Sequence, residues 1–273
     1  MPTFVLVHGA WHGSWYWCGV TRLLRARGHK VFAPTLCGLG DRAGELSQRV
    51  DLSRHVGDIV DLYRLHRLTD TVLVGHSYGG MVVTDAAGVL ADRIGALAYI
   101  DAFLPYQGLP ALAMQPEVRA RDILNGARQH GDGWKIPPRP AAAWRLEPEL
   151  CAEFDANAGF HPLATLTEPP RTSAADLDVA AKLYIEATGT GPGPFGACAA
   201  WTRGHDDWTT LTIDTHHFPM LSAPEAIARM LEEHAASAHA RTPASDNVTP
   251  MRGHRVCPPS AANMFSLHKG RNL

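Results

Sequence analysis

Short apolar runs alternate with helix-spaced stretches through the first hundred residues of the chain. Runs rich in β-branched residues have the length and character of buried strands at Thr3–Val7, Lys30–Ala33, Thr71–Val74 and Ala96–Ile100. Between them, apolar residues recur at the spacing of one helix face, which predicts helices over Trp15–Arg27, Leu52–Leu65 and Gly80–Leu90. Strands that alternate with helices predict an α/β fold with a mostly parallel sheet and helices on both faces.

The pattern changes after Leu104. Residues 104–173 hold many prolines and no clear strand, and they are too numerous for a simple loop, so they predict a small helical cap. Strand patterns return at Lys182–Ala187 and Thr209–Ile213, and a final helix is expected over Ala223–Ala236. We therefore expect a core of residues 1–103 and 174–238, and a disordered tail of residues 239–273 without periodicity.

The composition narrows the class of protein. The 273 residues are 45% hydrophobic with a formal net charge of -2, so neither nucleic acid nor an anionic membrane is an expected partner. The start of the chain lacks a signal-peptide pattern, and no apolar run approaches the ~18 residues of a membrane span. Five scattered cysteines indicate reduced thiols, and we expect a cytoplasmic protein. The chain has no H-E-x-x-H and no paired C-x-x-C, so no metal site is predicted.

One motif indicates a nucleophile. Gly75-His76-Ser77-Tyr78-Gly79 is a G-x-S-x-G sequence between a predicted strand and a predicted helix. In that setting the serine sits on a sharp turn that exposes its hydroxyl above the sheet, and the following helix directs its N-terminus at the site. Ser77 is therefore the predicted nucleophile.

An oxyanion formed by attack of Ser77 would need two N–H donors. The amide of Tyr78 follows the serine directly. The second donor should come from the turn after the first strand, His8-Gly9-Ala10-Trp11, which ends at the same edge of a parallel sheet. We assign it to the amide of Ala10.

A base and an acid complete the expected triad. Both His216 and His217 follow the last strand, and either position suits the base. The turn after Lys182–Ala187 has no carboxylate, so Asp101, at the end of the preceding strand, is the favoured acid. Glu186 and Asp214 remain alternatives.

These residues resemble a known family. Phe4–Trp15, Gly28–Val31 and Gly75–Gly80 are similar to the plant methylesterase and hydroxynitrile lyase branch of the α/β-hydrolases, and Pro34–Arg42 is similar to bacterial esterases of that branch. The resemblance implies the α/β-hydrolase fold and a cofactor-free serine hydrolase with a helical lid. It also implies that His217 is the base, because a His-Phe-Pro-Met stretch starts there, and it carries over the amides of Ala10 and Tyr78.

Departures from the family refine the expected function. The lyases have a threonine where Gly9 stands and a lysine where Phe218 stands, so ester hydrolysis is favoured over cyanohydrin cleavage. The plant enzymes have an Asp in the turn after Lys182–Ala187, whereas dehalogenase-type relatives place the acid at the position of Asp101.

The expected reaction is cleavage of a carboxylic ester, such as a methyl ester or lactone of an apolar or aromatic acid. Trp11, Phe103 and Phe218 are the expected substrate contacts. A ligand-binding or non-hydrolytic auxiliary protein on the same scaffold, and lyase-like C–C cleavage, remain the alternative functions. The expected partner is a small-molecule ester, and a homodimer is left open.

Overall fold

The chain is built on one six-stranded parallel sheet. A computed structural model describes residues 1–190 and 193–241. The sheet runs in the order β2-β1-β3-β4-β7-β8, and every neighbouring pair is parallel. Its strands are β1 Thr3–Val7, β2 Lys30–Phe32, β3 Thr71–His76, β4 Ile94–Ile100, β7 Ala181–Ala187 and β8 Trp208–Ile213. The predicted parallel sheet is confirmed.

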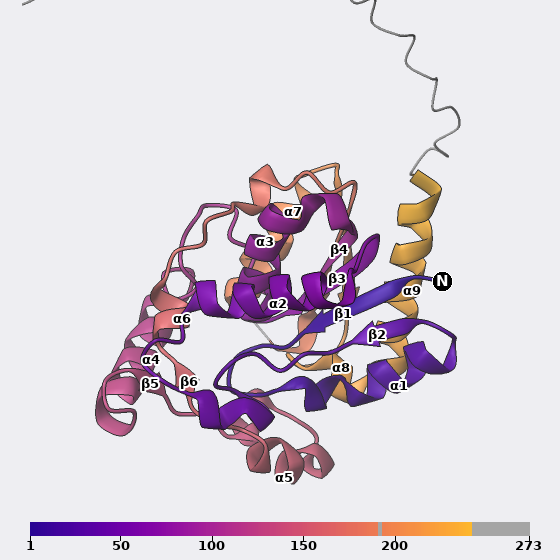
Figure 1. The fold of residues 1–273 in the computed structure, drawn as a ribbon. Coiled ribbons are helices and arrows are strands. Elements are labelled where there is room, and N and C mark those ends of the chain that lie inside the picture. Colours follow the sequence, from indigo (N-terminus) through magenta and orange to yellow (C-terminus); the bar gives the residue numbers. More distant parts are fainter. Residues whose placement is uncertain (191–192, 242–273) are drawn as a thin grey trace, which may run out of the picture. The chain divides into compact units, whose positions relative to one another are not determined.

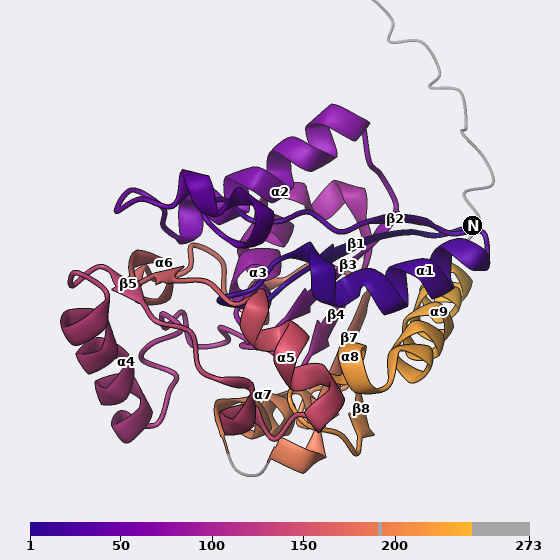
Figure 2. The same cartoon turned by 90° about the horizontal axis from the view of Figure 1, so that it is seen from below.

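Helices cover both faces of the sheet, as Figures 1 and 2 show. One face packs against α2 (Leu52–His66), α3 (Gly79–Leu90) and α7 (Pro194–Arg203), and the other packs against α1 (Cys18–Ala26), α8 (Pro219–Ser222) and α9 (Pro224–Arg241). Side chains of one strand alternate between the two cores: Val5 and Val7 face the first, whereas Phe4 and Leu6 face the second. This period of two is the geometry of a pleated strand that is buried on both faces.

Two elements of the core differ from the sequence prediction. The first helix starts as a 3₁₀ turn, Ser14–Trp17, because the three bulky aromatic residues there pack into the core before the regular helix begins. Helix α7 was not predicted, because Pro-Phe-Gly-Ala-Cys-Ala-Ala follows a glycine-rich turn and lacks a polar face. It crosses from β7 to β8, as a parallel pair requires.

The segment of residues 104–173 lies beside the carboxyl ends of the strands (Figure 1). It contains helices α4 (Glu117–His130), α5 (Pro148–Ala156) and α6 (Ala164–Thr167), in line with a helical segment. It also contains a small antiparallel pair, β5 (Lys135–Ile136) and β6 (His161–Pro162), that the sequence did not predict. Strands of two residues are too short to show an alternating pattern.

Helix α9 runs to Arg241, beyond the end predicted at Ala236. The predicted tail of residues 239–273 therefore begins inside a helix, and its remainder from residue 242 lies outside the described residues. Across the described part of the chain, no helix combines the length and the apolar character needed to cross a bilayer.

Helix α3 approaches the chain after β4 so closely that position 80 has no room for a side chain. A Cβ at Gly80 would lie 2.0 Å from the carbonyl oxygen of Phe103. We predict that Gly80→Ala destabilises the fold by about 3 kcal/mol or more, because backbone atoms cannot rotate away. Gly57→Ala on α2, where a Cβ meets nothing within 4 Å, should be neutral or stabilise by up to about 1 kcal/mol. Chemical denaturation of both variants measures this, and equal stabilities would contradict the packing argument.

Candidate active site

Ser77 sits on the sharp turn between β3 and α3. Its φ of 53° lies in the left-handed region, which is strained for a residue with a side chain. The turn is fixed by two amides that donate to the Ser77 carbonyl oxygen, from Gly80 at 3.1 Å and from Phe103 at 3.0 Å. The predicted strand–turn–helix setting of the G-x-S-x-G motif is therefore present.

The two glycines of the motif are required because other parts of the chain approach them too closely for a side chain. A Cβ at Gly75 would lie 2.7 Å from Val83 Cγ2, and a Cβ at Gly79 would lie 2.8 Å from two carbonyl oxygens, those of Val7 and His8. Both distances are shorter than the contact distance between non-bonded heavy atoms. The two glycines thus let β1, β3 and α3 meet tightly enough to present the Ser77 hydroxyl.

A chain of hydrogen bonds joins Ser77, His217 and Asp101. The Nε2 atom of His217 lies 2.9 Å from Ser77 Oγ, and its Nδ1 atom lies 2.6 Å from Asp101 Oδ2. The carboxylate accepts the Nδ1 proton, so Nε2 of the neutral ring accepts from the hydroxyl. All three side chains are buried, with the serine 8% exposed.

Burial sets the protonation of this group. Desolvation lowers the pKa of His217 and raises the pKa of Asp101, because it disfavours the charged form of each. The amide of Ala187 donates to Asp101 Oδ1 at 3.3 Å and acts in the opposite direction on that carboxyl. The imidazole is thus neutral and able to take a proton, and the carboxylate is positioned to stabilise the imidazolium that results.

The competing candidates are engaged elsewhere. His216 donates from Nε2 to Glu147 at 2.8 Å, and its Nδ1 accepts the amide of Phe218 at 3.1 Å. The carboxylate of Glu186 forms an ion pair with Arg203. Asp214 accepts from the hydroxyl of Thr188 at 3.4 Å, at an exposed site. The structure therefore brings Asp101, His217 and Ser77 together and leaves the other candidates apart.

The turn after β1 leaves one amide without an acceptor. The Gly9 amide donates to the Tyr16 hydroxyl, and the Trp11 amide donates to Nδ1 of His161 at 3.4 Å. Within residues 1–190 and 193–241, the amides of Ala10 and Tyr78 have no hydrogen-bond acceptor. These two amides, which the sequence analysis assigned to the oxyanion, are free to bind a developing negative charge.

A buried histidine connects the three turns that hold Ala10, Ser77 and His217. His76 donates from Nε2 to the carbonyl oxygen of His217 at 2.8 Å, and its Nδ1 accepts from the Tyr16 hydroxyl at 2.9 Å. Tyr16 in turn accepts the Gly9 amide. Since burial holds the pKa of His76 well below its usual range, the ring stays neutral and keeps one donor and one acceptor.

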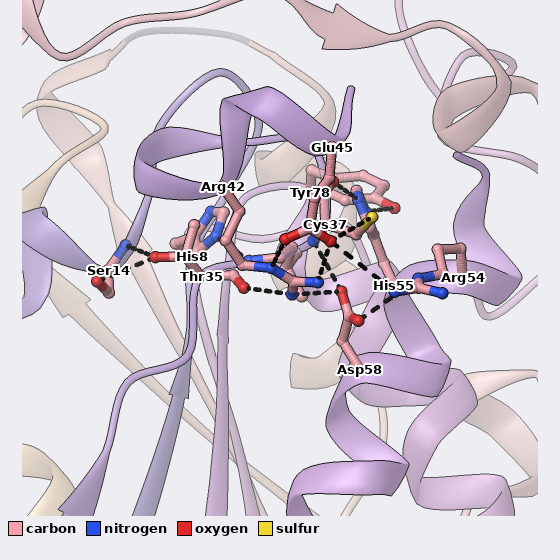
Figure 3. Close-up of polar contacts among 11 residues, drawn as sticks. His8, Ser14, Thr35, Cys37, Arg42, Glu45, Arg54, His55, Asp58 and Tyr78 are labelled. Carbon is pink, nitrogen blue, oxygen red and sulfur yellow. Dashed lines mark hydrogen bonds and ion pairs between the residues drawn. The ribbon is translucent and has the colours of Figure 1, made fainter. Parts of the chain in front are cut away.

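Two further histidines anchor the loop of residues 36–50 to the site (Figure 3). His8 donates from Nδ1 to the Gly9 carbonyl at 2.8 Å and accepts the Leu36 amide at 2.9 Å. His55 donates to the Cys37 carbonyl at 2.8 Å and accepts the Tyr78 hydroxyl at 2.9 Å. Burial lowers the pKa of both histidines to about 4, which keeps each ring in a single neutral tautomer.

The same loop is closed by an ion-pair cluster (Figure 3). Arg42 donates to Glu45 from Nε at 2.7 Å and from Nη2 at 2.6 Å, a two-point geometry that fixes both side chains. Its Nη1 atom lies 3.2 Å from Asp58 Oδ2, which also accepts the Cys37 amide at 2.7 Å. The stretch Pro34–Arg42 thus supports the turns that hold Ala10 and Tyr78.

A cavity of about 610 Å³ opens onto Ser77 and His217. Trp11 and Phe103, which are two of the expected substrate contacts, line it together with Trp144 and Phe195. Trp144 and Phe195 each stack on the His217 ring, with centroids 5.1 Å and 4.6 Å away. The sequence did not predict that these two rings stack on His217, because this contact depends on tertiary packing.

Phe218 does not line this cavity, contrary to the prediction of a substrate contact. It is 4% exposed and packs in the second core against Phe154 and Trp144. The residue after His217 turns inward because its amide is held by His216. Phe218 is therefore a packing residue behind the histidine.

Comparisons with known proteins agree with this geometry. The model of the alpha/beta hydrolase family matches residues 4–230, and the chain belongs to this family. A carbendazim hydrolyzing esterase of Nocardioides sp. (strain SG-4G) is 35% identical over 238 residues, which span 85% of this chain and 98% of that protein. An alpha-hydroxynitrile lyase of Arabidopsis thaliana is 33% identical over 103 residues, 37% of this chain and 40% of that protein.

A solved structure is similar over most of the chain. An extracellular alpha/beta-hydrolase from a Paenibacillus species superimposes with a TM-score of 0.76 at 22% identity, and the match covers 86% of this chain and 99% of that one. At this identity the likeness supports the fold. The predicted α/β-hydrolase fold and the resemblance to the esterase branch are confirmed.

The two neighbouring histidines can be separated by matched substitutions. We predict that His217→Gln abolishes activity on a p-nitrophenyl ester, because glutamine cannot take the Ser77 proton. His216→Gln should keep more than about a tenth of the turnover, since its ring contacts Glu147 and a backbone amide. Measurement of kcat for both variants tests the assignment, and the reverse ranking would transfer the role to His216.

The carboxylate can be tested in the same way. We predict that Asp101→Asn lowers kcat by up to ~10⁴, because an amide favours the wrong imidazole tautomer while preserving the shape of the side chain. Glu186→Gln is the matched control, since its ion pair with Arg203 lies outside the hydrogen bonds of His217. A larger loss in the control than in Asp101→Asn would overturn the choice of acid.

Proposed function

We propose that the protein is a carboxylic ester hydrolase that uses Ser77 as nucleophile, His217 as base and Asp101 as the orienting acid. The observation that carries the proposal is the continuous contact from Asp101 through His217 to Ser77 Oγ, with distances of 2.6 Å and 2.9 Å. Ester hydrolysis is also the activity named for the Nocardioides relative, which aligns over most of both chains.

The reaction proceeds in two halves. Ser77 Oγ attacks the ester carbonyl carbon as His217 Nε2 takes its proton, and the amides of Ala10 and Tyr78 bind the oxyanion. His217 then returns the proton to the leaving alcohol, which departs and leaves an acyl-enzyme. His217 Nε2 then takes a proton from a water molecule, which attacks the acyl carbon. As the Oγ–acyl bond breaks, the imidazolium returns this proton to Ser77 Oγ, and the acid is released.

The cavity favours an ester with an apolar or aromatic part. Trp11, Phe103, Trp144, Leu166 and Phe195 supply flat and branched apolar surface around the nucleophile. Several lining residues belong to the segment of residues 104–173, and we propose that this segment acts as the cap of the site. The core of residues 1–103 and 174–238 then supplies the catalytic side chains.

The alternative functions fit the site less well. Position 9 has no room for the threonine of the lyases, because a Cβ at Gly9 would lie 2.9 Å from the Cβ of Ser77. A lysine after His217 is absent, and Phe218 faces the core. A ligand-binding protein without turnover would have no need for the aligned serine, histidine and carboxylate.

Loss of the nucleophile is the direct test. We predict that Ser77→Ala lowers kcat/KM on short p-nitrophenyl and methyl esters by roughly 10⁴-fold or more. The fold should persist, since the hydroxyl makes no structural contact besides that with His217 among the described residues. Labelling by a fluorophosphonate should occur in the native protein and disappear in the variant. Activity within tenfold of the native protein would refute the serine mechanism.

A further inference from the structure

The cavity above Ser77 carries two half-buried arginines on its cap side. Arg119 lies in the first turn of α4, and Arg139 lies in the loop that follows β5. Both line the same cavity as Ser77 and His217. Arg145, an exposed residue, adds a third guanidinium at the margin. The predicted esterase mechanism uses none of these charges.

The cavity has no free carboxylate to match them. Asp101 is hydrogen-bonded to His217, and Glu186 forms an ion pair with Arg203. Neither Arg119 nor Arg139 forms an ion pair or a hydrogen bond with any residue that the structure describes. Asp122, an exposed neighbour on α4, favours their charged forms without an ion pair to either.

The two guanidiniums disfavour each other and are partly removed from water. Burial, together with the nearby charge of Arg139, lowers the pKa of Arg119 to about 10. Burial also lowers the pKa of Arg139. Both groups nevertheless stay charged near neutral pH. Half-buried like charges without a counter-ion are unfavourable, and a bound anion would relieve both the desolvation and the repulsion.

Arg139 is also linked to the catalytic histidine. Its guanidinium lies 4.7 Å from the ring centroid of Trp144, and that indole stacks on His217 at an interplanar angle of 17°. The charge of Arg139 reaches His217, where it contributes to the lowered pKa. The cationic side of the cavity is therefore close to the position of the scissile ester.

We infer that Arg119 and Arg139 bind a second anionic group of the substrate, so that the preferred ester carries a carboxylate besides its scissile bond. This inference rests on the proposed esterase function and names its substrate class. Guanidinium groups bind carboxylates through two parallel N–H donors, which would also orient the substrate. The aromatic side chains would hold the apolar part between the anion and the ester.

Matched pairs of substrates test the inference. Mono-4-nitrophenyl adipate carries the carboxylate on the acyl side, and its methyl ester is the neutral partner. 4-Acetoxybenzoate carries it on the alcohol side, with methyl 4-acetoxybenzoate as partner. We expect kcat/KM to favour the anionic member of at least one pair by about tenfold or more, and this ratio to fall as salt is added.

Single substitutions locate the effect. Arg119→Gln and Arg139→Gln should each lower that ratio by about tenfold, mostly through KM, because each removes a charged donor. Arg119→Lys and Arg139→Lys should restore part of it. Arg121→Gln is the control, since Arg121 is exposed on the same helix and paired with Glu117 at 2.7 Å. It should leave the ratio unchanged.

Binding without turnover provides a second measurement. Monomethyl adipate should raise the Tm of the Ser77→Ala protein, and dimethyl adipate at the same concentration should raise it less. The difference should vanish when Arg119→Gln and Arg139→Gln are added to that background. This arm tests the arginine site even if the chain hydrolyses no ester.

The outcomes separate the inference from the proposed function. Equal kcat/KM values within both substrate pairs, or a preference that both glutamine variants retain, would overturn the inference and leave the esterase standing. Absence of hydrolysis of all four esters, together with no fluorophosphonate labelling of Ser77, would overturn the proposed function. A Tm shift that is equal for the anionic and neutral adipates would overturn the arginine site by itself.

Discussion

The strained backbone of Ser77 is the constraint on which the rest of the site depends. A left-handed φ costs a residue with a side chain on the order of 1–3 kcal/mol, so it persists only where the surroundings enforce it. Here β3 is fully buried, the first turns of α3 are buried as well, and the Phe103 amide donates to the Ser77 carbonyl from the adjacent strand exit. The sheet and helix packing thus supplies the free energy that holds one hydroxyl in the cavity.

Buried neutral histidines carry this constraint from one turn to the next. His8, His55, His76 and His161 each join two loop groups, with one ring nitrogen donating and the other accepting. An apolar residue would leave those loop amides and carbonyls unsatisfied in a desolvated region. A protonated ring would have two donors and would lose one acceptor. Their lowered pKa values therefore maintain the geometry of the oxyanion turn and of His217 over a wide pH range.

The sequence predicted the sheet, and it indicates Ser77 as the nucleophile, because strands and the G-x-S-x-G motif both leave local patterns. The apolar, β-branched run Thr3–Val7 and the G-x-S-x-G motif can both be recognised in the sequence itself, although Gly79 is required by its close approach to the distant carbonyls of Val7 and His8. The choice between His216 and His217 needed a resemblance, because both follow β8 and differ only in the direction of their rings. Asp101 was chosen as the acid because the turn after β7 has no carboxylate. Its contact with His217 depends on tertiary packing, which leaves no signal in the local sequence.

Other features left no local signal. Helix α7 lacks a polar face, and β5 and β6 contain two residues each, so neither element produces a periodic pattern. Phe218 was misassigned as a substrate contact because proximity to the catalytic histidine in sequence does not fix the direction of a side chain. The buried histidines and the cap arginines lie in stretches that look like ordinary polar sequence, and only the fold brings them to the cavity.

Under the proposed function, one side of the cavity carries out the reaction and the other side selects the substrate. The strand ends carry Ser77, His217 and the amides of Ala10 and Tyr78, which are the groups proposed to act on the ester carbonyl. The segment of residues 104–173 carries Arg119, Arg139 and Trp144, which line the cavity and would contact the parts of a bound ester away from the reacting bond. Binding energy from such remote groups raises the rate when it positions the carbonyl against Ser77. Because Trp144 contacts both Arg139 and His217, an anion held by the arginine would place the substrate beside the same indole that stacks on His217.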